Sequence, residues 1–137
     1  MDAPDTPRIG QPTRRSDVEL RLPADGAFVS VLRTAASGLA ARLDFTIDDI
    51  EDVRMAVSEA CALALPQAAE DSDLVAQFYL DPGSITASVS VSAAEPKPTD
   101  FDSWAWQVLT ALTAEATSTA ADGRFTVSMT LRSAVDA

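Results

Sequence analysis

The sequence has 137 residues, of which 47% are hydrophobic and 23% are charged, a size and composition suited to one folded domain. Ten basic and 21 acidic residues leave a net charge of −11, which repels phosphate backbones and anionic lipid, so direct binding to nucleic acid or to a membrane is not expected. The sole cysteine, Cys61, excludes an internal disulfide, and the absence of histidine excludes Ser-His-Asp and Cys-His catalysis and His-ligated zinc.

We interpret residues 1–16 as a flexible tail, because they contain three prolines and little apolar surface to bury. The folded domain is expected over 17–133, with a short second tail over 134–137. No apolar run is long enough to span a membrane and no hydrophobic signal core is present, which favours a cytoplasmic protein. The only basic cluster lacks aromatic neighbours that could stack on bases, and it consists of Arg8, Arg14, Arg15 and Arg21.

The first half of the folded domain predicts one strand and two helices. Apolar and charged residues alternate over 18–22, the two-residue period of a strand with one buried face. Over 24–43 apolar residues recur at intervals of three and four, which indicates a first long helix. Thr46 is a suitable N-cap for a second helix that runs to Leu65, and carboxylates follow it in the first turn, where the helix dipole favours them.

The second half predicts a hairpin, a helix and a closing strand. The hairpin strands are expected over 74–80 and 85–91, and a third helix over 101–116. Asp122-Gly123 is a turn before a last strand over 125–131. The order β-α-α-β-β-α-β predicts a two-layer α/β sandwich with a mostly antiparallel sheet and all helices on one face.

The second helix contains an unusual stripe. One broad face is apolar and should pack against the sheet, which makes Cys61 a buried, inert thiol. The opposite face presents Met55, Glu59 and Leu63 at i, i+4 and i+8, although a solvated stripe would normally be polar. The acidic group over 48–52 is interpreted as a solvated helix start, since its spacing does not match a cation-binding loop.

Residues 48–65, and Ala56 to Cys61 in particular, resemble the N-box helix of bacterial anti-sigma serine kinases, which have a histidine-kinase-like ATPase fold. The similarity extends over about 17–133, because the predicted order of elements is also that of the family. Residues 103–115 resemble the helix that follows the family's ATP lid. The resemblance implies the same fold here.

The resemblance also implies a degenerate nucleotide site. Glu59 matches the family's general-base glutamate, whereas the position of its Mg²⁺-binding asparagine is Leu63, which offers no oxygen. Residues 92–96 have neither the aspartate nor the glycines of the adenine box. Trp104 and Trp106 stand where the lid glycines are expected. We therefore expect no metal and no cofactor, and Mg-ATP only if the chain is an active kinase.

The singled-out residues each have a simpler interpretation. Glu59 suits an ordinary surface carboxylate, which we prefer in the absence of a metal ligand. Trp104 and Trp106 lie about 200° apart on a helix, so one can face the core while the other fills the vacated pocket or reaches a partner. Arg33 matches a partner-contacting arginine of the family, and it also suits an ordinary exposed arginine.

The leading hypothesis is an anti-sigma factor that dimerises and sequesters a sigma factor, with an anti-anti-sigma factor as its antagonist. An active, divergent serine kinase that phosphorylates the anti-anti-sigma factor is the first alternative. The second alternative is a non-catalytic adaptor domain that has lost both kinds of partner.

Overall fold

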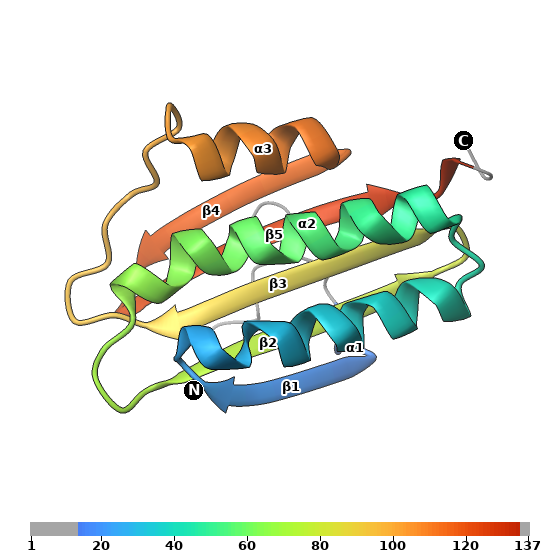
Figure 1. The fold of residues 1–137 in the computed structure, drawn as a ribbon. Helices are drawn as coiled ribbons and strands as arrows, with labels where there is room; N and C mark the ends of the chain where they lie inside the picture. Colours follow the sequence, from blue (N-terminus) through green and yellow to red (C-terminus); the bar gives the residue numbers. More distant parts are fainter. Residues whose placement is uncertain (1–13, 135–137) are drawn as a thin grey trace.

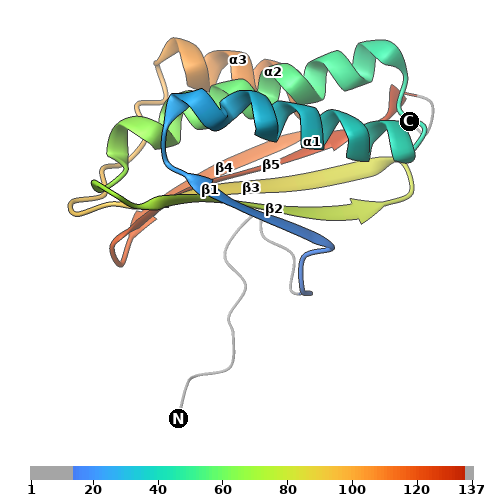
Figure 2. The same cartoon turned by 60° about the horizontal axis from the view of Figure 1, so that its bottom comes forward.

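The computed structural model describes residues 14–134, which form a two-layer α/β sandwich (Figure 1). Figure 2 shows the helices of this part of the chain together on one face of its five-stranded sheet. The predicted fold class is therefore confirmed. In chain order the elements are β1 Val18–Pro23, α1 Val29–Arg42, α2 Ile47–Ala64, β2 Asp73–Asp81, β3 Ser84–Ser92, α3 Trp104–Leu112, β4 Glu115–Ala121 and β5 Arg124–Arg132, with short 3-10 turns at Gly26–Phe28 and Leu65–Gln67.

The sheet has the strand order β1-β2-β3-β5-β4, and every neighbouring pair is antiparallel. Its register aligns apolar residues in rows across the strands. One row consists of Val18, Phe78, Ala87, Met129 and Ala116, one residue from each strand. Because side chains alternate between the two faces of a strand, such rows build a continuous apolar face under the helices.

Small residues allow α1 and α2 to approach each other and the sheet closely. α2 begins as predicted at Thr46, whose hydroxyl accepts a hydrogen bond from the Asp49 amide at 3.1 Å. None of the helices in residues 14–134 is long and apolar enough to span a membrane. The close approach of α1 and α2 to each other and to the sheet depends on alanines with no exposed surface, which are Ala36, Ala40, Ala56, Ala60 and Ala64.

The third helix is shorter than predicted and a strand was missed. We expected a helix over 101–116, but α3 ends at Leu112, and residues 115–121 form the edge strand β4. The true order is thus β-α-α-β-β-α-β-β. β4 consists of small and polar residues and lacks the apolar alternation that marks a half-buried strand. The available signal was Asp122-Gly123, whose φ angles of 55° and 74° suit a two-residue hairpin turn that requires a strand on both sides.

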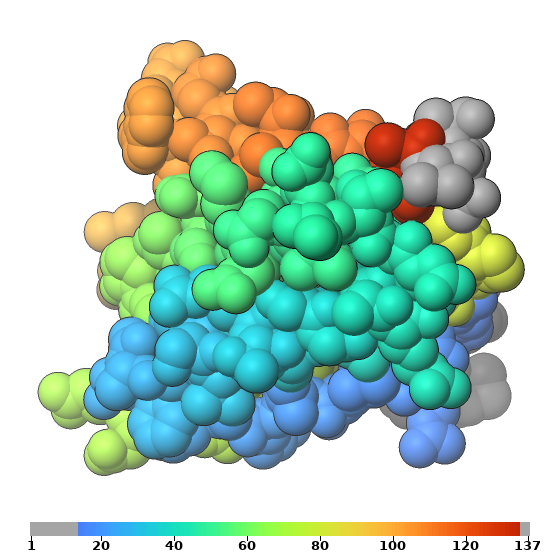
Figure 3. Space-filling view, turned by 45° about the vertical axis from the view of Figure 1, so that its right-hand side comes forward, coloured from blue at the N-terminus to red at the C-terminus, as the bar shows by residue number. Residues whose placement is uncertain are grey.

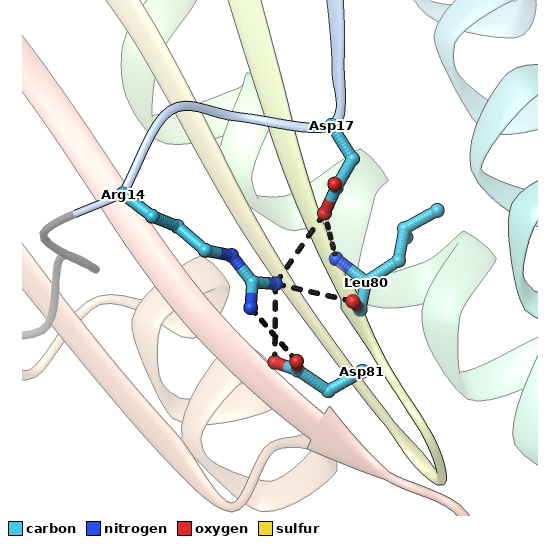
Figure 4. A network of polar contacts seen from close by, with 4 residues as sticks. All are labelled: Arg14, Asp17, Leu80 and Asp81. Atoms are coloured by element: carbon cyan, nitrogen blue, oxygen red, sulfur yellow. Dashed lines mark hydrogen bonds and ion pairs between the residues drawn. The ribbon is translucent and has the colours of Figure 1, made fainter.

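Arg14 attaches the start of the described chain to the β2–β3 hairpin (Figure 4). Its guanidinium binds the Asp81 carboxylate through two hydrogen bonds of 2.9 and 3.2 Å and the Leu80 carbonyl at 3.1 Å. Asp17 lies 3.3 Å from the same guanidinium and accepts the Leu80 amide at 2.7 Å. Of the predicted tails, residues 1–13 with Arg8, and residues 135–137, lie outside the described residues.

Asp49 connects the start of α2 to the chain after β5. Its carboxylate accepts hydrogen bonds from the Ala134 amide at 2.9 Å and the Ser133 hydroxyl at 3.5 Å. The Ala134 bond is the main reason that the pKa of Asp49 lies below its usual 3.8. An acid with a lowered pKa stabilises the fold above its unfolded pKa, and the contribution is lost as the pH falls through the folded value.

We therefore predict that Asp49→Asn flattens the acid side of the stability curve. Urea midpoints measured from neutral pH to below pH 4 should fall less steeply in this variant than in the wild-type chain. Asp48→Asn is the matched control. Burial raises the pKa of Asp52, and the charges of Asp49 and Asp48 both add to that rise, but the Asp48 carboxylate accepts no hydrogen bond from Ala134. Equal slopes in the two variants would contradict the role given to the Ala134 contact.

Candidate functional site

The stripe of Met55, Glu59 and Leu63 on α2 divides into exposed and packed parts. Met55 is 47% exposed. Glu59 is half-buried, and its side chain has no hydrogen bond or ion pair within residues 14–134. Leu63 is half-buried and packs against the apolar core. The position predicted to replace a metal-binding asparagine is thus part of the hydrophobic packing.

Cys61 lies on the face of α2 that packs on the sheet, as its spacing predicted. It is 1% exposed, and burial raises the pKa of its thiol to about 12. A thiol in this state is a poor nucleophile, because the thiolate is the reactive form. No cluster of acidic or Cys side chains suited to a metal ion occurs among the described residues.

The two tryptophans have different surroundings, as their angular separation predicted. Trp106 is half-buried, packs against the core, and meets the ring of Phe101 edge to face at a centroid distance of 5.1 Å. Trp104, the first residue of α3, is 79% exposed. Of the two, Trp106 is therefore the one placed to occupy interior space, and Trp104 is available to another molecule.

The loop between β3 and α3, residues 93–103, is attached to the 3-10 turn Leu65–Gln67 that follows α2. The side chain of Gln67 donates to the Lys97 carbonyl at 2.9 Å and accepts the Lys97 amide at 2.7 Å. The Ala93 amide donates to the Gly123 carbonyl at 2.9 Å. Beside this attachment lies a shallow hollow of about 290 Å³, lined in part by Ala94 and Glu95 from the segment that we predict to lack the adenine box. No sequence motif indicated the role of Gln67.

Arg33 lies on α1, is half-buried, and contacts α2 through its side chain. Its Nη1 donates to the Ser58 hydroxyl at 3.2 Å, and that hydroxyl donates to the Arg54 carbonyl at 3.1 Å. Ser58 precedes Glu59 on α2, whereas Trp106 belongs to α3, which packs against α2. Glu59 and Leu63 on α2 and Trp106 on α3 therefore lie on helices that pack against each other. Trp104 lies at the exposed start of α3.

Comparison with curated proteins shows similarity to bacterial serine-protein kinases. The chain is 43% identical over 56 residues to the serine-protein kinase RsbW of Bacillus velezensis, and 42% identical over 64 residues to RsbW of Halalkalibacterium halodurans. This similarity, which covers less than half of the chain, is to serine-protein kinases of the RsbW type. The matches cover 41% and 47% of the chain, but only 35% and 38% of those relatives. No protein-family model matches it.

Two solved structures share the fold of this chain. The RsbU and RsbW domains of Rv1364c from Mycobacterium tuberculosis superpose with a TM-score of 0.69 at 23% identity, covering 85% of this chain and 31% of that one. The histidine kinase domain of the Erythrobacter litoralis EL346 blue-light activated kinase gives a TM-score of 0.52 at 15% identity, covering 90% and 66%. The predicted histidine-kinase-like fold is confirmed.

Proposed function

We propose that this RsbW-like chain is a cytoplasmic anti-sigma factor that binds a sigma factor directly, as a homodimer, and prevents it from joining RNA polymerase. We further propose that its nucleotide site is degenerate, so that control does not depend on phosphoryl transfer. The observation that carries the second proposal is the packing of Leu63 against the core. The resemblance of the chain to the kinase family implies a Mg²⁺ ligand at this position.

The chemistry of the surrounding residues supports a degenerate site. Mg²⁺ requires oxygen ligands in near-octahedral geometry, and Leu63 has none. Trp106 adds a half-buried indole beside the core, on a helix that packs against α2. Gln67 holds the loop that replaces the adenine box, through both polar groups of Lys97. A nucleotide would have to displace these contacts and would find no glycine-rich backbone to bind its phosphates.

The charge of the chain supports a sigma factor as the partner. Sigma factors bind promoter DNA, and DNA-binding surfaces are strongly basic because they neutralise phosphates. A regulator with a net charge of −11 would be attracted to such a surface at long range, which raises the association rate. The same charge opposes direct contact of the regulator with DNA. Displacement by an anti-anti-sigma factor would then release the sigma factor.

The test of sigma binding is co-purification of the tagged chain with each alternative sigma factor of its host. One of them should be retained, and retention should weaken as salt is raised. Arg33→Ala should reduce the affinity at least about fivefold if Arg33 contacts the partner. Arg42→Ala should leave the affinity unchanged, since Arg42 is exposed in the last turn of α1. Failure to retain any of these sigma factors would overturn the proposal and favour the adaptor alternative.

Calorimetric titration with ATP and Mg²⁺ tests the nucleotide site. We expect no heat of binding at micromolar concentrations, and we expect Leu63→Asn to restore none, because the adenine and lid boxes are also replaced. Binding to the wild-type chain would show that the pocket is functional. Binding to Leu63→Asn alone would show that one missing ligand accounts for the loss.

Two observations favour the kinase alternative, which can be tested directly. The curated relatives are serine-protein kinases, and Glu59 remains half-exposed without a protein partner in the described residues. Incubation with labelled ATP and the host's anti-anti-sigma proteins should transfer no phosphate if the proposal is right. Transfer to a serine, abolished by Glu59→Gln, would establish the kinase.

A further inference from the structure

An exposed aromatic pair with acidic neighbours lies where the β3–α3 loop meets α3. Phe101 is 57% exposed and Trp104 is 79% exposed, and the exposed residues Asp100 and Asp102 flank Phe101. We call these four residues the aromatic corner. In Figure 3 the amber segment around residue 100 projects beside the green end of α2. No other part of residues 14–134 places two such exposed aromatic side chains within four residues of each other.

Backbone contacts hold the aromatic corner in one conformation. The Asp100 carboxylate accepts the Asp102 amide at 2.9 Å, and its carbonyl accepts the Ser103 amide at 3.0 Å. Gln107 donates to the Phe101 carbonyl at 3.0 Å. The Phe101 ring meets Trp106, which packs on the core. The aromatic groups are therefore presented on a fixed framework, which reduces the entropy lost when a partner binds.

The composition of the corner specifies the chemistry of that partner. Tryptophan and arginine are among the residues that most often dominate the energy of protein interfaces. A guanidinium stacks on an indole face by cation–π attraction, and adjacent carboxylates strengthen the attraction to the same cation. Phosphate-bearing ligands and a second copy of this acidic chain would be repelled by Asp100 and Asp102.

We propose that the aromatic corner is a docking site for an arginine-bearing helix on a basic protein partner. The arginine stacks on Trp104, its charge faces Asp100 and Asp102, and apolar residues of the same helix cover Phe101. The identity of the partner as a sigma factor rests on the proposed function, but the chemistry of the site does not.

The first experiment uses a fluorescently labelled short helical peptide with Arg and Leu on one face, and measures its anisotropy as the full chain is added. Binding should weaken about 30-fold in Trp104→Ala. Ile47→Ala is the matched control and should bind like the wild-type chain. Ile47 is 80% exposed at the start of α2, which lies at the opposite end of the helix layer from the start of α3 (Figure 1). The same peptide with Glu in place of Arg should not bind.

A second pair of variants separates local from overall charge. Asp100→Asn with Asp102→Asn and Asp48→Asn with Glu51→Gln remove the same charge, but the second pair lies on the first turns of α2. The corner pair should weaken peptide binding about fivefold at low salt, and the α2 pair should change it less than twofold. Equal effects of the two pairs, or equal binding by Trp104→Ala and Ile47→Ala, would overturn the proposal.

The same variants, tested against a retained sigma factor, distinguish the two proposals. Loss of sigma binding in Trp104→Ala supports both. If a sigma factor binds Trp104→Ala and Ile47→Ala equally, the proposed function is supported. The same result would show that the aromatic corner does not contribute to sigma binding. Trp104-dependent peptide binding without any sigma partner would support the docking site and overturn the proposed function.

Discussion

Replacing Phe78 with alanine is expected to lower the free energy of unfolding by about 3–5 kcal/mol. Phe78 is 1% exposed and lies near the middle of the sheet, paired with Val18 on β1 and Ala87 on β3. Truncation removes a large buried apolar surface and leaves a cavity that the flanking strands cannot close without losing their register. For a domain of this size the loss is a large fraction of its total stability.

Urea unfolding measures this effect, and Phe101→Ala provides the comparison. Phe101 loses the same atoms but is 57% exposed and has one edge-to-face contact with Trp106, so its truncation should cost less than about 1.5 kcal/mol. Losses of similar size in the two variants would mean that Phe78 does not lie in the core as described.

The thiol of Cys61 is expected to react with a disulfide reagent at pH 8 at least about a thousandfold more slowly in the folded chain than in urea. Burial raises its pKa from 9.0 to about 12, which lowers the thiolate fraction at that pH by a comparable factor. Since the folded state holds this proton more tightly, the thiol's contribution to stability is complete below pH 9 and declines as the pH rises toward 12.

An exposed thiol on the same helix serves as the control. Ala62 is exposed and adjacent to Cys61, so Ala62→Cys in a Cys61→Ala background should react at the rate of an open cysteine. Absorbance of the released thiolate follows both reactions. If the native Cys61 reacted as quickly as the thiol at position 62, the packing of α2 on the sheet would be wrong.

Elements with strong local signals could be predicted from the sequence. The Thr46 cap fixed the start of α2, and Pro82-Gly83 fixed the β2–β3 turn, where Gly83 has a φ of 72°. β4 could not be found by periodicity, because its position depends on pairing with β5 rather than on its own side chains. The helix predicted up to residue 116 extended into that strand because alanine and leucine favour a helix locally.

The candidate site was predictable only in part. Helical spacing correctly predicted that Cys61 is buried. It also predicted that Trp104 and Trp106 have different surroundings, of which only that of Trp106 is the core. The hydrogen bond from Arg33 to Ser58 and the attachment of Lys97 to Gln67 join residues that are 25 and 30 positions apart. Such contacts depend on how the helices and loops pack, which no local pattern in the sequence specifies.

The strand order has a consequence for how the chain folds during synthesis. β5, the last strand of the described chain, lies between β3 and β4, so the sheet remains in two incomplete parts until residues 124–132 have left the ribosome. Until then β3 has one open edge, and the apolar face beneath α2 lacks Phe125, Val127 and Met129. Nascent chains stalled before residue 124 should therefore be protease-sensitive and prone to associate through that edge.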